Sequence, residues 1–305
     1  MNPSTTVLNQ LSAIVGSDQI RINEPMSAHT TFRVGGPASF YASPRTAAEI
    51  VSLVKYCRAS QLPYYILGNG SNLLVSDQGY DGVIIQLSQN LNAVSIEGQT
   101  ITAQAGALLS RIASEALKCS LTGLEFAAGI PGTLGGAVVM NAGAYGGQMK
   151  DVLVCATLMD QTGNMRTLSV DELALGYRTS IIANQNDVVL EAVLQLRKGN
   201  AQEIKAQMDM LAAQRRDKQP LEYGSAGSTF KRPEGYFAGK LIQDAGLRGY
   251  RIGDAQVSEK HCGFIINRGH ATAAEIYQLI QEVQRIVLER HSVALEPEVK
   301  LLGRF

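Results

Sequence analysis

The sequence of 305 residues lacks an excess of charge of either sign, because Lys+Arg and Asp+Glu each number 27. Proteins that bind nucleic acid or an anionic membrane through their electrostatic field carry a surplus of basic residues. We therefore expect no nucleic-acid and no membrane partner, and nothing in the sequence implies a protein partner. Small molecules are the expected ligands.

Cysteines and long apolar runs are also scarce. The chain has four cysteines, Cys57, Cys119, Cys155 and Cys262, with no C-x-x-C pair and no closely spaced histidine. This pattern argues against a metal site and against a disulfide scaffold. No basic residue precedes Arg21, and no apolar run reaches the length of about eighteen residues that a membrane span requires. These absences predict a cytoplasmic protein. The length of 305 residues, with 45% hydrophobic and 18% charged residues, predicts a globular fold of two or three lobes.

Glycine, in contrast, is concentrated in one segment. Residues 129–147 read GIPGTLGGAVVMNAGAYGG, with seven glycines and no charged side chain. Such a density is typical where the backbone needs positive φ angles or is approached closely by a ligand. Without lysine or arginine, an anion bound here would be held by backbone N–H groups. A phosphate-bearing cofactor is the first hypothesis, and a tightly turned structural loop is the alternative.

The periodicity of apolar residues predicts an α+β fold rather than a regular βαβ alternation. Capping boxes at Thr46–Glu49 and Thr272–Glu275 predict two helix starts. A composition shift near residue 200 marks a candidate domain boundary. Helices are expected at 46–61, 108–117, 200–218 and 272–287, and strands at 64–67, 82–87, 93–96, 100–104, 152–159, 187–197, 263–267 and 293–302.

Two common nucleotide-binding motifs are absent. The G-x-G at Gly68–Gly70 has Leu73 where the Rossmann fingerprint needs a third glycine. Gly239-Lys240 is followed by leucine and lacks the upstream glycine of a P-loop. The loops at 68–72 and 129–147 are thus left to hold one long ligand. A dinucleotide with a central pyrophosphate fits that requirement.

Several ordered motifs resemble one family. TFRVGG (31–36), ILGNGSNLL (66–74), GIPGTLGG (129–136) and MNAG (140–143) are similar to the FAD-binding segments of the UDP-N-acetylenolpyruvoylglucosamine reductase (MurB) family of bacterial cell-wall synthesis. The similarity continues through YRTS (177–180), SAGSTFK (225–231), AGKLIQDAGLRG (238–249) and EPEVK (296–300). It covers residues 25–303.

The resemblance implies an α+β FAD-binding fold of the vanillyl-alcohol-oxidase type. Two subdomains, which we place at residues 1–95 and 96–200, would hold FAD between them. A substrate domain at 201–305 would cover the flavin ring, with the last strand able to return to the flavin domain. The implied cofactor-binding residues are Arg33, Gly35, Gly68, Asn69, Gly70, Ser71, Asn72, Gly129, Ile130, Pro131, Gly132, Gly135, Gly136, Asn141 and Gly143.

The family reaction is the NADPH-dependent reduction of the enolpyruvyl ether of a UDP-amino sugar to UDP-N-acetylmuramate, in peptidoglycan synthesis. Hydride from reduced FAD N5 places negative charge on the α-carbon and carboxylate, so a cation must stabilise it and an acid must protonate the carbon. By resemblance, Ser228 donates the proton, Arg178 binds the carboxylate, and Glu298 is the third catalytic residue. Each residue also has a structural alternative. Ser228 is compatible with a turn serine, Arg178 with a surface arginine, and Glu298 with a glutamate on an edge strand.

The sequence offers further candidates for the catalytic and substrate-binding site. We expect a raised pKa for Glu298, although Glu296 is a surface neighbour that competes for its role. Lys300 lies on the same strand face as Glu298, if that segment is extended. Lys231 and Lys240 are the cations available for the UDP diphosphate. Lys300 is expected to bind the substrate carboxylate or diphosphate, with a solvated lysine as the alternative. His261 lies in a segment that resembles one near the substrate in the family, with a structural histidine as the alternative.

The chain also departs from the family pattern. Arg232 stands where many members have asparagine, and Gly224 stands where proline is common, which we expect to loosen the loop carrying Ser228. The extra tyrosine-bearing loop of one family branch is missing, which predicts the shorter type.

No second dinucleotide motif remains, so NADPH and the sugar nucleotide are expected to use one cleft in turn. A flavin-dependent alcohol oxidase of the same cofactor fold is an alternative, and a non-catalytic nucleotide-sugar-binding flavoprotein is another.

Overall fold

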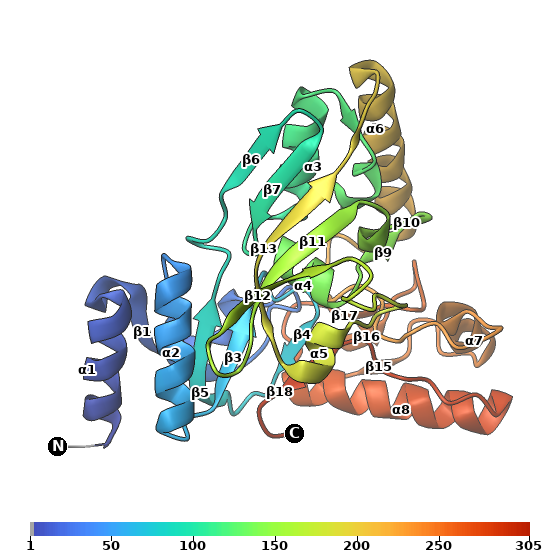
Figure 1. Ribbon diagram of the computed structural model, residues 1–305. Helices are drawn as coiled ribbons and strands as arrows, with labels where there is room; N and C mark the ends of the chain where they lie inside the picture. The colour runs from blue at the N-terminus through green and yellow to red at the C-terminus, as the bar shows by residue number, and fades with distance from the viewer. Residues whose placement is uncertain (1–2) are drawn as a thin grey trace. The chain divides into compact units, whose positions relative to one another are not determined.

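The computed structural model describes residues 3–305 and has an α+β fold, as predicted (Figure 1). The helices are α1 (Pro3–Val15), α2 (Ala47–Ala59), α3 (Leu109–Lys118), α4 (Leu134–Val139), α5 (Ile181–Gln185), α6 (Ala201–Lys218), α7 (Ala238–Asp244) and α8 (Ala273–His291). The strands are β1 (Ile20–Pro25), β2 (Pro37–Ala42), β3 (Tyr64–Leu67), β4 (Leu73–Val75), β5 (Tyr80–Gln86), β6 (Val94–Glu97), β7 (Thr100–Gln104), β8 (Leu121–Thr122), β9 (Gly143–Ala144), β10 (Gly147–Gln148), β11 (Leu153–Met159), β12 (Met165–Ser169), β13 (Val188–Gln195), β14 (Arg197–Lys198), β15 (Arg251–Ile252), β16 (Ala255–Val257), β17 (Ile265–Asn267) and β18 (Lys300–Leu302).

The described chain divides into two compact units, and each is built from separate stretches of sequence. The first unit contains residues 3–22, 40–69 and 82–214, and the second contains residues 23–39, 70–81 and 215–305. The second unit thus takes two short stretches from the N-terminal part of the chain. The domain boundaries predicted at residues 95 and 200 stay predictions.

A five-stranded antiparallel sheet, with strand order β12-β11-β13-β7-β6, lies in the first unit (Figure 1). Burial alternates along β7, where Ile101 and Ala103 are buried and their neighbours are half-buried. This period of two is what a sheet with one covered face requires. Helix α4 packs against β13 and β7. The predicted hairpin of β6 and β7 is confirmed, with Ile96 opposite Ile101.

A second sheet has the order β1-β2-β5-β3, with β3 parallel to β5. Helix α2 precedes β3 and buries Ile50, Leu53, Val54 and Cys57, the helical face expected from the sequence. The capping box predicted at its start is only half formed. The Thr46 side chain accepts the Glu49 N–H, but the Glu49 carboxylate accepts the N–H of Arg45 at 2.6 Å.

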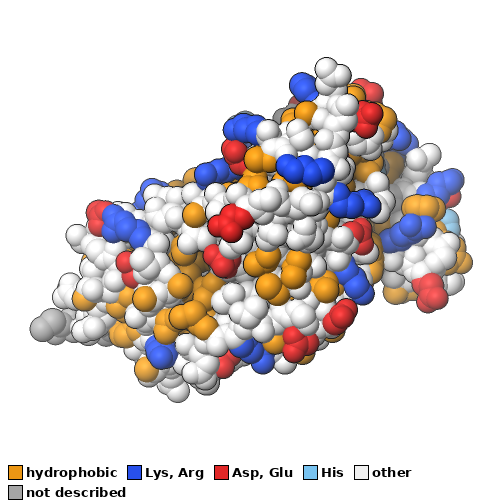
Figure 2. All heavy atoms as spheres, turned by 45° about the horizontal axis from the view of Figure 1, so that its top comes forward, with side chains coloured by type: hydrophobic (Ala, Val, Ile, Leu, Met, Phe, Trp, Pro, Cys, Tyr) orange, Lys and Arg blue, Asp and Glu red, His pale blue; other side chains and the backbone are white. Residues whose placement is uncertain are grey.

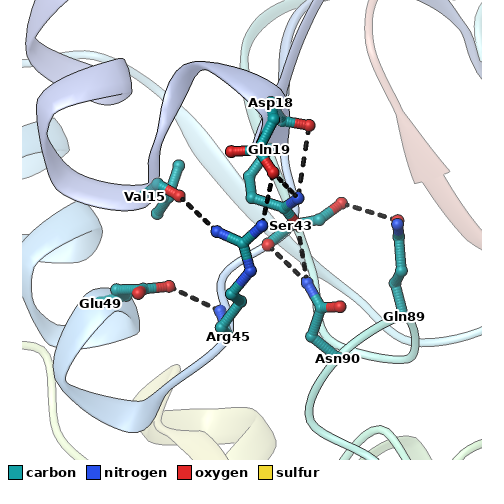
Figure 3. Close-up of polar contacts among 8 residues, drawn as sticks. All are labelled: Val15, Asp18, Gln19, Ser43, Arg45, Glu49, Gln89 and Asn90. Carbon is teal, nitrogen blue, oxygen red and sulfur yellow. Dashed lines mark hydrogen bonds and ion pairs between the residues drawn. The ribbon is translucent and has the colours of Figure 1, made fainter.

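The side chain of Arg45 ties the end of α1 to this region, as Figure 3 shows. It pairs with Asp18 and donates to the carbonyl of Val15 at 3.4 Å. Nearby, Asn90 Nδ2 donates to Gln19 Oε1 and to the carbonyl of Ser43, both at 2.8 Å. The segment between α1 and β1 is thus fixed by side-chain hydrogen bonds from two other parts of the first unit, at Arg45 and Asn90.

Helix α8 packs against the β15-β16-β17 sheet of the second unit. The predicted capping box is complete, because Thr272 accepts the Glu275 N–H and Glu275 accepts the Thr272 N–H. The carboxylate of Asp77 also accepts the N–H groups of Ala273 and Ala274, at 2.8 and 2.9 Å. Three side chains therefore satisfy donors that a helix start leaves unpaired.

The C-terminal strand is shorter than predicted. Only β18 forms, and it runs parallel to β4. The expected strand residues before it make a single bridge, Pro297 opposite Phe230. The bonds on either side of this bridge, Lys231 N–H to Glu296 and Glu298 N–H to Thr229, are both present, so the Pro297 nitrogen faces away from residue 230. Without an N–H, Pro297 cannot donate to a further strand on that other side.

Within residues 3–305, no helix is both long and apolar enough to cross a lipid bilayer. On the face shown in Figure 2, basic and acidic side chains are interspersed.

Candidate active site

The two predicted cofactor loops meet inside the first unit. A Cβ added to Gly68 would lie 2.3 Å from Thr133 Oγ1, and Thr133 is almost fully buried. Asn69 Nδ2 donates to the carbonyl of Pro131 at 2.7 Å. Residues 68–69 and 131–133 are therefore in direct contact, although more than sixty positions separate them in the sequence.

Much of the glycine in segment 129–147 has a structural reason. Added Cβ atoms would lie 2.9 Å from Ala105 at Gly135 and 2.6 Å from the Phe126 ring at Gly147. A Cβ at Gly143 would lie 2.7 Å from the Gly147 carbonyl, across the β9–β10 hairpin. The segment also contains helix α4, which is not among the helices predicted from the sequence. Protein atoms, rather than a ligand, thus approach these three glycines.

Gly136 is different. It is exposed on α4, and an added Cβ would meet only Thr133 Oγ1, at 3.7 Å. Gly129 and Pro131 are exposed too, whereas Ile130 and Gly132 are half-buried. The backbone around Gly136 is therefore the part of the segment that a ligand can approach.

The loop at residues 31–36 is packed against residues 70–75 within the second unit. An added Cβ at Gly70 would lie 1.9 Å from the carbonyl of His29, and Gly70 has a φ of +61°. The Thr31 N–H donates to the Gly70 carbonyl at 3.2 Å. Gly35 has a φ of +126°, and Arg33 has a φ of 60°, which is uncommon for a residue with a side chain.

Thr31, which we did not predict as a site residue, has a buried hydroxyl without a hydrogen-bond partner among the described residues. Buried hydroxyls are usually paired, so an unpaired one beside Gly70 is a position for a ligand contact. The open backbone at Gly136 and this hydroxyl each fit a polar cofactor on their own unit. The position of Thr31 at the start of the TFRVGG motif is the feature of the sequence that could have indicated it as a site residue.

Ser228 and Glu298 are brought together by the bridge at Phe230 and Pro297. The Glu298 N–H donates to the carbonyl of Thr229, the residue after Ser228, at 2.8 Å. Ser228 is exposed and follows Gly227, which has a φ of +76° and open space around its α-carbon. No other residue between 3 and 305 forms a hydrogen bond with the Ser228 hydroxyl. Two of the three predicted catalytic residues thus lie on paired segments of the second unit.

Asn72 joins the cofactor loop to the Glu298 segment. Its Nδ2 donates to the Glu298 carbonyl at 3.1 Å, and its own carbonyl accepts the N–H of Lys300 at 3.0 Å. Ser71, beside it, is half-buried. The backbone on both sides of Val299 is therefore fixed to residue 72.

Arg178 lies in the first unit, on a tight turn in which the Gly176 N–H donates to the Thr179 carbonyl at 3.1 Å. Its φ is 55°, in the left-handed region. The guanidinium lies 5.2 Å from the Tyr177 ring centroid, and Nη2 donates to the Gly143 carbonyl at 3.4 Å. The structure thus links Arg178 to the glycine-dense segment.

The predicted substrate cations lie in the second unit, and two of them are paired. Lys231 pairs with Glu296 across the bridge, and Lys240 pairs with Asp244 one turn along α7. Lys300 is exposed. Glu296 is also exposed, whereas Glu298 is half-buried, which distinguishes the two competing carboxylates by environment.

His261 is held as a neutral ring. Its Nδ1 accepts the Gly263 N–H at 3.1 Å, which leaves the proton of the neutral ring on Nε2. Burial lowers the pKa of His261 below its usual value. The ring also lies 4.8 Å from Phe264, edge to face. His261 therefore presents an N–H donor rather than a positive charge.

The two departures from the family pattern have local explanations. An added Cβ at Gly224 would lie 2.6 Å from the Phe32 carbonyl, and the Gly224 carbonyl accepts the Asn267 N–H at 2.8 Å. The expectation that Gly224 loosens the loop is wrong, because this backbone is closely packed and paired. Arg232 lies over the Phe237 ring at 3.9 Å and donates to the Tyr236 carbonyl at 3.3 Å.

Comparison with known proteins agrees with these features. Residues 38–169 match the family model "FAD binding domain", and residues 219–302 match "UDP-N-acetylenolpyruvoylglucosamine reductase, C-terminal domain". The chain is 51% identical to the UDP-N-acetylenolpyruvoylglucosamine reductase of Caldanaerobacter subterraneus subsp. tengcongensis over 297 residues, which cover 97% of this chain and 98% of that protein. The protein of the same name from Clostridioides difficile is 50% identical over 99% of both chains.

A solved structure is similar over nearly its whole length. The crystal structure of UDP-N-acetylenolpyruvylglucosamine reductase (MurB) from Thermus caldophilus matches with a TM-score of 0.81 and 35% identity, covering 93% of this chain and 100% of that chain. The predicted FAD-binding fold and the predicted family are confirmed. The chain belongs to the UDP-N-acetylenolpyruvoylglucosamine reductase family of FAD-dependent oxidoreductases.

Proposed function

We propose that this protein reduces the enolpyruvyl ether of UDP-N-acetylglucosamine enolpyruvate to UDP-N-acetylmuramate, with NADPH as the electron donor, in peptidoglycan synthesis. The names of its relatives, at about half identity over the full length, support the substrate. The observation in the structure that supports it best is the bridge that places Ser228 and Glu298 on paired segments.

In this proposal, bound FAD supplies the hydride that reduces the alkene. The exposed backbone at Gly136 would contact the cofactor from the first unit, where the N–H groups of Leu134 and Gly135 already donate to the carbonyls of Ala107 and Ala105. In the second unit, the loop 31–36 with Gly70 would contact it through N–H groups and the Thr31 hydroxyl. The remaining cofactor residues implied by the resemblance stay predictions.

The chain's own residues then stabilise charge and move a proton. Arg178 binds the substrate carboxylate with its planar fork and stabilises the charge that develops there. Ser228 Oγ donates a proton to the α-carbon. Glu298, which we still expect to have a raised pKa, stabilises the enolic oxygen as a hydrogen-bond donor.

The substrate-binding residues act on the nucleotide side. The neutral His261 contributes an Nε2–H donor, and Lys300 contributes a positive charge. Lys231 and Lys240 would have to exchange their carboxylate partners for the diphosphate oxygens. NADPH and the UDP-sugar bind in turn at one cleft.

The experiment compares Ser228→Ala with Ser225→Ala, a control serine of the same loop. We expect both variants to bind flavin and to be reduced by NADPH as the unmodified protein is. Only Ser228→Ala should lose formation of UDP-N-acetylmuramate, measured by mass spectrometry, by a factor of roughly 10² or more. Equal product formation by the two variants would contradict the assignment of Ser228.

Loss of NADPH-driven flavin reduction together with product formation would instead indicate a structural role for this serine. Rapid consumption of oxygen by the unmodified protein, without reduction of the sugar nucleotide, would indicate a flavin oxidase. Flavin that NADPH bleaches and the sugar nucleotide does not restore would indicate a non-catalytic flavoprotein.

A further inference from the structure

We propose that Asn141 positions Arg178, and that its side chain acts inside the protein rather than on the cofactor. The resemblance placed Asn141 among the cofactor-binding residues, but its contacts point to the turn that carries Arg178. This inference rests on the proposed function only where it assigns Arg178 to the substrate carboxylate.

The side chain of Asn141 is buried, with 3% exposure, and its polar atoms are already used. Nδ2 donates to the Gly176 carbonyl at 3.1 Å and to Gln148 Oε1 at 2.9 Å. Oδ1 accepts the N–H of Lys150 at 2.9 Å. A carboxamide has two N–H donors and two acceptor positions, so one lone pair remains for any ligand.

The bond to Gly176 fixes the start of the Arg178 turn, and a second bond fixes its end. Ser180 is buried, and its hydroxyl donates to the carbonyl of Val139, the last residue of α4, at 2.6 Å. Residues 139 and 141 of the glycine-dense segment thus hold both ends of a turn whose corner is Arg178. The whole arrangement lies within the first unit.

The turn needs such support because its backbone is strained. Arg178, at the corner of the turn, has a φ of 55°, and this left-handed conformation persists in an arginine only where the surroundings hold it. A guanidinium can bind a carboxylate through two parallel hydrogen bonds only when its orientation is fixed. If the turn that carries Arg178 becomes mobile, this bidentate binding is lost for part of the time. A loosened turn should therefore slow the reductive step on the substrate more than it weakens cofactor binding.

The experiment uses the full-length flavoprotein and three variants. Asn141→Ala removes all three side-chain bonds, and Ser180→Ala removes the bond at the other end of the turn. Asn164→Ala is the control, because Asn164 lies in an exposed turn of the same unit and bonds only to Asp160 and Thr162 through its side chain. Hydrogen–deuterium exchange of peptides containing residues 176–180 reports on the turn without reference to catalysis.

We expect Asn141→Ala to retain its FAD, to exchange faster at residues 176–180, and to reoxidise with the enolpyruvyl sugar about tenfold more slowly or worse, with less effect on reduction by NADPH. In an Arg178→Ala background, the same substitution should slow reoxidation by less than about twofold, because residues that act through one another are not additive. Asn164→Ala should match the unmodified protein in every measurement.

Two results would overturn the proposal. The first is loss of FAD from Asn141→Ala with unchanged exchange at residues 176–180, which would indicate a cofactor contact. The second is a full, multiplicative effect of Asn141→Ala in the Arg178→Ala background. If Asn141→Ala does not fold, Asn141→Asp keeps the acceptor for the Lys150 N–H and removes only the donors, and the same criteria apply.

Failure of the proposed function would look different. In that case the unmodified protein would not reoxidise with the enolpyruvyl sugar at all. The exchange measurement would still decide whether Asn141 holds the Arg178 turn.

Discussion

At the scale of single residues, the glycines of the two loops separate into those that other protein atoms approach and those that face open space. Gly68 belongs to the first kind, since Thr133 occupies the position of a side chain. Gly136 belongs to the second kind. A substitution by alanine should therefore affect the two positions in opposite ways when the cofactor is removed.

For Gly136→Ala we expect the FAD-free protein to gain up to about 1 kcal/mol in free energy of unfolding, because alanine favours a helix over glycine. Its affinity for FAD should fall, because the added methyl group occupies the open face. Gly68→Ala should lower stability with and without FAD. Urea denaturation and FAD titration of the apoprotein measure both effects, and unchanged FAD affinity in Gly136→Ala would remove Gly136 from the cofactor site.

His261 gives a prediction for pH. Its folded-state pKa lies below the ordinary value of 6.5 because of burial, so the unfolded chain takes up the proton first as the pH falls. The contribution of neutral His261 to stability is therefore complete above pH 6.5 and is lost below it. His261→Asn should show a shallower loss of urea midpoint than the unmodified protein between about pH 7 and pH 5. Parallel curves for the two proteins would contradict this assignment.

The sequence could place many of these residues in motifs but could not show what each one contacts. The clustering of glycine is visible in the sequence, but the residues that contact Gly68 and Gly135 are distant in sequence. A glycine approached by a ligand and a glycine approached by another part of the protein therefore look the same in the sequence. Asn141 was assigned to the cofactor because it lies in a cofactor motif. Its bond to Gly176 depends on tertiary structure, as does the unpaired hydroxyl of Thr31.

At the scale of elements, the two predicted capping boxes differ in strength. The box at Thr272 is reciprocal, whereas Glu49 turns to Arg45 instead of Thr46. Thr272→Ala should destabilise the second unit by about 1 kcal/mol, which is typical for loss of a threonine cap. Asp77 continues to satisfy two N–H groups of α8, so the helix itself should persist.

Urea denaturation followed by circular dichroism measures this loss. Thr46→Ala is the matched control and should cost about the same, because each substitution removes one side-chain hydrogen bond, from the N–H of Glu49 or of Glu275. A loss in only one of the two variants would contradict this prediction.

Elements with strong local signals were predicted well, and those that depend on distant partners were not. The amphipathic faces of α2 and α8 and the hairpin of β6 and β7 are set by residues close in sequence. Helix α4 was missed because its glycines oppose a helix, and packing on β13 and β7 overrides that preference. The strand expected at 293–302 was too long because β18 pairs only with the short β4.

At the scale of the whole molecule, the chain builds two units from interleaved segments, which no composition shift revealed. The second unit takes residues 70–81 from between two stretches of the first, so the loop at 68–72 contributes to both. The composition shift near residue 200 does not reveal this interleaving. A change in composition marks one position along the chain, whereas the two units are defined by contacts between segments distant in sequence.

The proposal that NADPH and the UDP-sugar occupy one cleft in turn predicts ping-pong kinetics for the whole enzyme. Initial rates measured over a matrix of both substrates should give parallel double-reciprocal lines, and each substrate should inhibit at high concentration by occupying the other's place. Intersecting lines, or a complex containing both ligands, would show that they bind together.

The most direct test of the central claim is a single turnover of the flavin. The purified protein is reduced anaerobically with one equivalent of NADPH and then mixed with UDP-N-acetylglucosamine enolpyruvate, while the absorbance of oxidised flavin is followed. We predict that the yellow absorbance returns with formation of one UDP-N-acetylmuramate per flavin. A flavin that stays reduced after the sugar nucleotide is added would contradict the account.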